Sequence, residues 1–233
     1  MRRDGRAMII LAFDCAGAAC SVAVVRDGSV LARDSRALSH GQAEVLVPMI
    51  QATLAAAGLR HADLSAIATT LGPGSFTGLR AGLAAARGLA LATGLPAVGI
   101  STLEAAAHAV APDERRAASV MAAVDTRRDD LFVQVFGQDL REAGPPRVET
   151  ASDAASRAPA GALVLAGDAT APLLAALRAG ERDAVVASSA GPIDPTVVAR
   201  LGAERLAAGR AGDPLRPLYL RAPDVTPAPA RRR

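Results

Sequence analysis

Two aspartates end apolar stretches of similar composition, and carboxylates at such positions can hold a metal–phosphate group. Asp14 closes the run IILAFD, and Asp125 closes the run SVMAAVD. If each run is a buried strand, the two carboxylates lie at equivalent strand ends and can flank a cleft that binds magnesium through oxygen ligands. The same side chains can instead form turns by accepting hydrogen bonds from nearby amides. The residues alone leave both interpretations open.

The segment GPGSFTG, residues 72–78, is a glycine-rich turn in front of a helix. Free N–H groups at a helix N-terminus bind anions, and Ser75 or Thr77 can cap the helix. The segment is not a P-loop because no Gly-Lys-Ser/Thr follows, and it does not fit the G-x-S-x-G pattern of a nucleophilic serine. The candidate cofactor-binding residues are Asp14, Gly74, Ser75 and Asp125.

The histidines and cysteines do not form a pattern typical of a metal site. His40, His61 and His108 fit neither H-x-x-x-H nor H-E-x-x-H, and no Cys/His spacing suits zinc. Cys15 and Cys20, the only cysteines, are expected to be reduced buried thiols, because two cysteines in a chain of this length do not make a disulfide framework. We therefore expect no metal site built from histidine or cysteine ligands, and we assign no metal ligand in this chain.

The helix after the glycine-rich turn is built from very small residues. Gly78, Gly82 and Ala86 recur at a spacing of four, so another backbone can approach them closely. This row indicates either a helix that docks onto another molecule or close packing inside its own domain. Arg80 lies in the first turn, where the helix dipole disfavours a cation. Arg80 therefore indicates an acidic partner or an anion at the loop, and the alternative is that its position on the surface has no specific reason.

Hydrophobic periodicity and turn residues predict the elements that position these groups. Residues 8–110 have the order strand, strand, strand, helix, strand, helix, strand, helix, and the order recurs after a polar break at 112–116. This predicts a duplicated α/β fold, βββαβαβα twice, with two lobes and mixed sheets. The predicted parts are a first lobe at 8–111, a divergent second lobe at 112–221, and disordered tails at 1–7 and 222–233.

Composition limits the classes of partner. Hydrophobic residues make up 51% of the chain but aromatic residues only 2%, so the core must be aliphatic. The net charge is +3; each tail carries +2, which leaves −1 for the remainder. A domain that grips RNA by its phosphates should be basic, so direct tRNA or DNA binding by the core is disfavoured, with a local basic patch as the alternative that stays open. No apolar run is long enough for a transmembrane helix, and we expect a cytoplasmic protein.

Four stretches of this sequence closely resemble the TsaB (YeaZ) family. They are ILAFDCAGAACSVAVVRDG, SHGQAEVLVPMI, GPGSFTGLRAGLAAARGLAL and GISTLEAAA, which together fall within residues 8–107. The resemblance continues weakly at VDTRRDDLFVQVF and PLYLRAPDV. It implies the duplicated, actin-like and ribonuclease H-like ATPase fold, in agreement with the predicted element order.

The resemblance also implies a function. It suggests a non-catalytic scaffold or activating subunit that pairs with TsaD and with the ATPase TsaE to modify the adenosine next to the anticodon of tRNA. ATP or ADP and the metal are then expected to bind to the partner subunits, and this chain is expected to have no cofactor of its own. Contact with tRNA is expected only through the complex. TsaD has an H-x-x-x-H metal motif, whereas the matching helix here offers only His40. A homodimer is expected when the chain is alone.

In the family, the helices of the first half pack against those of TsaD. This implies an interface on the first two helices, and our chosen interface residues are Met49, Ala52, Gly82, Ala85, Ala86 and Leu89. The alternative is an ATP-dependent kinase or ATPase of the same fold that acts alone and uses Asp14 and Asp125 with magnesium.

Overall fold

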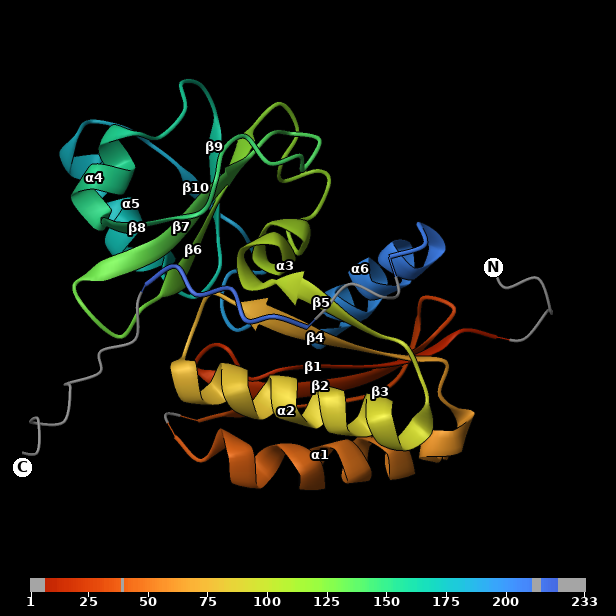
Figure 1. Ribbon diagram of the computed structural model, residues 1–233. Coiled ribbons are helices and arrows are strands. Elements are labelled where there is room, and N and C mark those ends of the chain that lie inside the picture. The colour runs from red at the N-terminus through yellow and green to blue at the C-terminus, as the bar shows by residue number, and fades with distance from the viewer. Residues whose placement is uncertain (1–6, 39, 211–214, 222–233) are drawn as a thin grey trace, which may run out of the picture.

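The computed structural model describes residues 7–38, 40–210 and 215–221 and contains two five-stranded mixed sheets with helices on their faces (Figure 1). The predicted disordered tails lie outside these residues, except for Ala7. In chain order the elements are β1 (Ile9–Asp14), β2 (Ala19–Arg26), β3 (Ser29–Ala37), α1 (Gln42–Ala56), a 3₁₀ turn (His61–Asp63), β4 (Ala66–Gly72), α2 (Phe76–Thr93), β5 (Ala97–Ser101), α3 (Thr102–His108), β6 (Ser119–Asp125), β7 (Asp130–Phe136), β8 (Arg147–Thr150), α4 (Ala151–Ser156), β9 (Leu163–Ala166), α5 (Thr170–Ala179), β10 (Val185–Val186) and α6 (Pro195–Ala207).

The two sheets have the same topology. The first has the order β3-β2-β1-β4-β5, and the second has the order β8-β7-β6-β9-β10. β1 pairs antiparallel with β2 and parallel with β4, and β6 pairs in the same two ways with β7 and β9. The predicted duplicated α/β fold is therefore confirmed.

Local sequence explains the first hairpin. Asp27 and Gly28 join β2 to β3, and both have positive φ, as the favoured two-residue hairpin turn requires. β1 is buried along its whole length, because it is the central strand of a sheet that is covered on both faces. This explains why its sequence is a continuous apolar run rather than an alternating one.

The third helix of each half lies between the two sheets and contacts the sheet of the other half. α6 packs across β1, β2, β4 and β5, while α3 packs on β6 and β7 as well as on its own sheet. Residues of both halves consequently form one apolar cluster, to which α3 contributes Leu103 and α6 contributes Val198 and Leu201. Because the halves share this core, the limits 8–111 and 112–221 stay a prediction.

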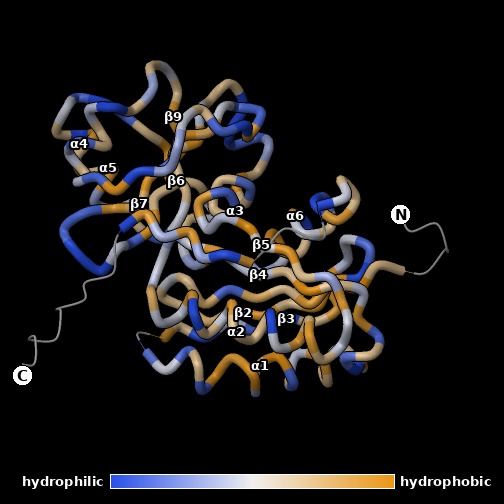
Figure 2. The backbone as a smooth tube through the Cα atoms, viewed as in Figure 1, coloured by the Kyte–Doolittle hydropathy of each residue, from blue (hydrophilic) through white to orange (hydrophobic). Residues whose placement is uncertain are grey.

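The remaining helices cover the outer faces of the sheets. α1 and α2 lie side by side on the first sheet, and α4 and α5 lie on the second (Figure 1). In Figure 2 the central strands β1, β4 and β6 are coloured mainly as hydrophobic. No helix among the described residues is long and apolar enough to cross a bilayer.

We expect the substitution Gly202→Ala to lower the free energy of unfolding by about 1–2 kcal/mol. A Cβ at Gly202 of α6 would lie 2.9 Å from Ala68 Cβ and 3.2 Å from Val98 Cγ2, and overpacking of this kind outweighs the higher helix propensity of alanine. Urea unfolding followed by circular dichroism measures the change.

The matched control is Gly88→Ala in α2, where an added Cβ meets no atom within 4 Å. It should raise the free energy of unfolding by about 0.5–1 kcal/mol through helix propensity alone. If Gly202→Ala stabilised the protein as well, α6 would not pack as closely on the first sheet as the structure shows.

Candidate functional site

Three aspartates converge where strands of both sheets end. Asp14 ends β1, Asp125 ends β6, and Asp168 follows β9. The Oδ1 atom of Asp168 accepts a hydrogen bond of 3.0 Å from the Asp125 amide, and its Oδ2 atom faces Gly17 in the turn after Asp14. Asp168 therefore links the two predicted residues. Asp168 was not among the predicted site residues. The feature of the sequence that could have identified it is the Gly167-Asp168 pair after an apolar run.

Asp14 is buried, and burial raises its pKa to about 6. The Oδ1 atom accepts hydrogen bonds from the Thr70 hydroxyl at 2.5 Å and from the Ala16 amide at 3.1 Å. These bonds favour the charged form and partly offset the burial, whereas the charge of Asp168 raises the pKa further. Burial also raises the pKa of Asp168. The ends of β1 and β9 thus bring together two carboxyl groups that resist joint ionisation.

The structure supports the turn interpretation of both predicted aspartates. Asp14 accepts a hydrogen bond from the amide two residues later, and Asp125 does the same with the Arg127 amide at 2.8 Å. The Asp125 carboxylate also lies 3.7 Å from the Arg127 guanidinium. The two halves therefore repeat one Asp turn, and neither aspartate needs a metal to explain its position.

The glycine-rich turn packs directly on the turn that follows β1. The Ser75 amide donates to the Ala16 carbonyl at 2.7 Å. A Cβ on Gly74 would lie 2.4 Å from the Ala16 oxygen, and one on Gly78 would lie 1.9 Å from the Cys15 oxygen. These two glycines are therefore required for close backbone contact, and at these positions the turn packs against protein rather than forming an open anion-binding loop.

Ser75 caps α2 as predicted, because its hydroxyl accepts from the Gly78 amide at 3.3 Å. The guanidinium of Arg80 lies 3.6 Å from the centre of the Phe76 ring. Arg80 forms no ion pair with a carboxylate in the described parts of the chain, so the expected acidic partner is not found there, and the bound anion stays a prediction. Across those same residues, no group of three or more His, Cys, Asp or Glu side chains is placed to hold a metal ion.

Three of the six predicted interface residues are buried inside this chain, which corrects the prediction for them. Met49 and Ala86 are fully buried. Gly82 is also buried, and a Cβ added to it would lie 3.5 Å from Thr69 Oγ1. They lie where α1 and α2 pack on the first sheet, so none of the three is available to a partner. Ala52 is exposed, and Ala85 and Leu89 are half-buried; their role in an interface stays a prediction.

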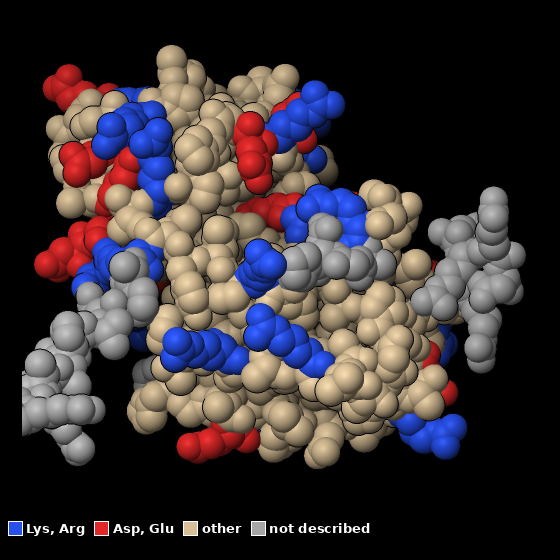
Figure 3. Space-filling view, viewed as in Figure 1, with Lys and Arg blue, Asp and Glu red and all other residues tan. Residues whose placement is uncertain are grey.

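The surface of these two helices is formed by other residues. We call it the outer helix face, and we define it by the exposed uncharged residues Val47, Pro48, Gln51, Ala52 and Ala55 of α1 and Ala84, Gly88 and Leu91 of α2. Exposed Glu44 of α1 and exposed Arg80 and Arg87 of α2 lie on the same two helices. Val47 is 49% exposed and Leu91 is 88% exposed. Figure 3 shows this region to be mostly uncharged, with basic side chains over α2. The sequence did not show which row of small residues faces outwards.

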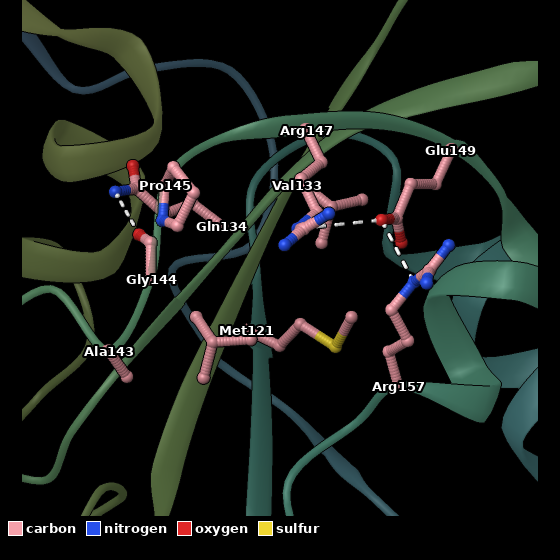
Figure 4. A pocket seen from close by; sticks show the side chains of 10 residues that line it. Met121, Val133, Gln134, Ala143, Gly144, Pro145, Arg147, Glu149 and Arg157 are labelled. Atoms are coloured by element: carbon pink, nitrogen blue, oxygen red, sulfur yellow. Dashed lines mark hydrogen bonds and ion pairs between the residues drawn. The ribbon is translucent and has the colours of Figure 1, made fainter.

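A cavity of about 200 Å³ lies in the second lobe, beside β6, β7 and β8 (Figure 4). Its wall includes the Glu149 carboxylate, which lies 3.8 Å from Arg147 Nε and 3.1 Å from Arg157 Nε. Met121 and Val133 form an apolar side. None of the three aspartates lines this cavity, so it is separate from the candidate site.

The chain is similar to several known proteins. A family model described as "TsaD: tRNA N6-adenosine threonylcarbamoyltransferase" matches residues 36–172. The tRNA threonylcarbamoyladenosine biosynthesis protein TsaB of Escherichia coli is 39% identical over 132 residues, which cover 57% of this chain and 56% of that protein. An uncharacterized protein of Mycobacterium tuberculosis is 33% identical over 220 residues, 94% of each chain. The chain thus spans little more than half the length of its Escherichia coli relative.

Solved structures agree in fold. The structure of YeaZ from Pseudomonas aeruginosa has a TM-score of 0.73 at 28% identity and covers 91% of this chain and 100% of its own. Component A of the (R)-2-hydroxyglutaryl-CoA dehydratase from Acidaminococcus fermentans has a TM-score of 0.53 at 11% identity, covering 86% of this chain and 99% of its own. The second likeness concerns the fold alone.

We expect Asp14→Asn to stabilise the protein increasingly as the pH rises. The pKa of Asp14 is raised in the folded state from 3.8 to about 6, so its stabilising contribution is complete below pH 3.8 and is lost as the pH rises through 6. The variant keeps an Oδ1 acceptor for Thr70 and Ala16 and cannot ionise. Its free energy of unfolding relative to the natural chain should therefore increase by roughly 2–3 kcal/mol between pH 4 and pH 7.

Urea unfolding at several pH values measures this difference. Asp139→Asn, which removes a carboxyl group from an exposed turn, is the matched control. A pH-independent difference for Asp14→Asn would show that Asp14 is not in the buried environment described here.

Proposed function

The chain belongs to the TsaB (YeaZ) family, and on that premise we propose that it is a non-catalytic scaffold and activating subunit of the machinery that makes threonylcarbamoyladenosine in tRNA. The name of its relatives in Escherichia coli and Haemophilus influenzae supports this process. The proposed partners are a TsaD-like transferase and a TsaE-like ATPase, acting in the cytoplasm on the adenosine next to the anticodon.

The single observation that carries the proposal is the outer helix face. Large uncovered apolar patches are rare on monomers and mark interaction surfaces. Small side chains such as Ala84 and Gly88 also let another helix approach closely, while Leu91 extends into solvent and can be buried by a partner. The surface therefore suits a helix pair of another chain.

The partner we propose for this face is a TsaD-like protein. A family model that describes the transferase matches this chain over α1 and α2, so a TsaD-like partner should have two corresponding helices. Two such pairs can form an interface of the kind seen in a two-fold dimer. A second copy of this chain can use the same face, which is the basis of the proposed homodimer.

The arrangement of the aspartates and the glycine-rich turn supports a non-catalytic role for this chain. The turn after β1 is covered by the glycine-rich segment, and Asp14 and Asp168 oppose the charge of a polyphosphate. ATP or ADP and the metal are accordingly proposed to bind to the partner subunits.

The alternative, a kinase or ATPase that acts alone through Asp14 and Asp125, is tested by calorimetry with ATP and magnesium. Tight binding, with turnover lost in Asp14→Ala, would favour that alternative.

We expect Ala84→Arg to prevent binding to the TsaD-like partner. The arginine would place a long charged side chain at the centre of the outer helix face, and Ala84 is exposed, so the variant should fold normally. Isothermal titration of the purified partner should show at least a hundredfold loss of affinity, because an unpaired charge must be desolvated.

The matched control is Ala175→Arg. Ala175 is an exposed residue of α5, the helix that corresponds to α2 in the second half. This variant should bind the partner as the natural chain does. Equal affinity of both variants, or no binding by the natural chain, would contradict the proposal.

A further inference from the structure

Two of the five aromatic residues in this chain meet on its surface. The rings of Phe76 and Tyr219 lie 5.2 Å apart with an interplanar angle of 37°. They are 36% and 41% exposed, whereas Phe13, Phe132 and Phe136 are buried. Arg80 covers Phe76 with its guanidinium group. We call Phe76, Arg80 and Tyr219 the aromatic platform.

The platform is held by a well-anchored segment, residues 215–221. The Leu218 amide donates to the Leu71 carbonyl at 2.7 Å, and the Arg87 guanidinium donates to the Leu215 carbonyl. Leu215 itself is buried in the core under α1 and α2. At the other end, Arg221 forms an ion pair with Asp130 of the second lobe. Tyr219 is therefore held in place on the surface and does not need to be ordered by a ligand.

The two elements that carry the platform, α2 and residues 215–221, hold arginines without a carboxylate partner among the described residues. Neither Arg80 nor Arg87 of α2, nor exposed Arg216 of the segment that carries Tyr219, forms an ion pair with any carboxylate of residues 7–38, 40–210 and 215–221. Figure 3 shows basic side chains gathered over α2 on this face. The local charge is thus positive, although the chain outside its tails has a net charge of −1.

Exposed rings with arginines nearby are the two components of a single-strand nucleic-acid site. Bases stack on aromatic side chains, and the basic groups follow the phosphates; a guanidinium over a ring adds a further stacking surface. We propose that the aromatic platform stacks an unpaired base of RNA, with Tyr219 as the open ring and Arg216 beside a phosphate. This deepens the proposed function, on which it rests, because the adenosine next to the anticodon lies in a single-stranded loop.

A peptide partner fits this surface less well. Both rings are exposed and lie on elements with arginines that pair with no described carboxylate, whereas protein interfaces bury their aromatic anchors in desolvated pockets. The positive charge matches the phosphate backbone, whose neutralisation dominates nucleic-acid affinity. The platform also adjoins the outer helix face along α2, so that an RNA loop bound there could contact the partner as well.

The test uses the complex of this chain with its TsaD-like partner and a fluorescein-labelled RNA hairpin that has an anticodon loop with unmodified adenosine. Fluorescence anisotropy at several salt concentrations gives the affinity. Tyr219→Ala should weaken binding about tenfold, as expected for loss of one stacked base, and Tyr219→Phe should retain it. Arg216→Gln should reduce the slope of log K against log salt by roughly 0.7.

Partner binding is measured first without RNA, which separates the two proposals. If the complex forms and Tyr219→Ala binds RNA as the natural chain does, the platform does not contact RNA. If Tyr219→Ala instead loses the partner but not the RNA contact, the platform is a protein interface and our inference is wrong. If the natural chain forms no complex, the proposed function fails, and ultraviolet crosslinking of Tyr219 in the isolated chain to the same RNA at low salt still decides whether the platform binds RNA.

Discussion

The structure depends on the need to cover both faces of two apolar sheets. β1 is buried along its whole length, so the first sheet needs a helical layer on each side. The helices α1 and α2 supply one layer, and α6 from the other half supplies the second. The shared core joins the lobes, and among the described residues the outward rows of α1 and α2 are left without a protein neighbour. The surface proposed for partner binding is thus a consequence of how the core is closed.

A second constraint is close backbone contact at the ends of the strands. The turn after β1 and the glycine-rich segment lie so near each other that a Cβ at Gly78 would meet the Cys15 carbonyl. This packing fixes the start of α2 and the environment of Asp14, which then accepts its hydrogen bonds from Thr70 and Ala16. Consequently, the motif that resembles a phosphate-binding loop has a structural role in this chain.

The few aromatic residues of this chain are divided between its core and its surface. The core is packed almost wholly from aliphatic side chains, and the single tyrosine lies outside it. Its segment contacts α2 and then reaches the second lobe through Arg221. The outer helix face and the aromatic platform are neighbours on α2, so one rigid helix positions both proposed contact surfaces.

The amino-acid sequence by itself determined the order of the elements, the Asp27-Gly28 hairpin and the Ser75 cap. These depend on local periodicity and turn chemistry, and the duplicated fold followed from their repetition. Only the tertiary structure decided which row of α2 faces the sheet, because a helix with small apolar residues on every side has no periodicity that marks its inner face. Gly82 and Ala86 were therefore assigned to the wrong side, as was Met49 on α1. The contacts of Asp168 with Asp125 and of Tyr219 with Phe76 likewise join residues far apart in the chain, and such pairs meet only once the sheets have packed.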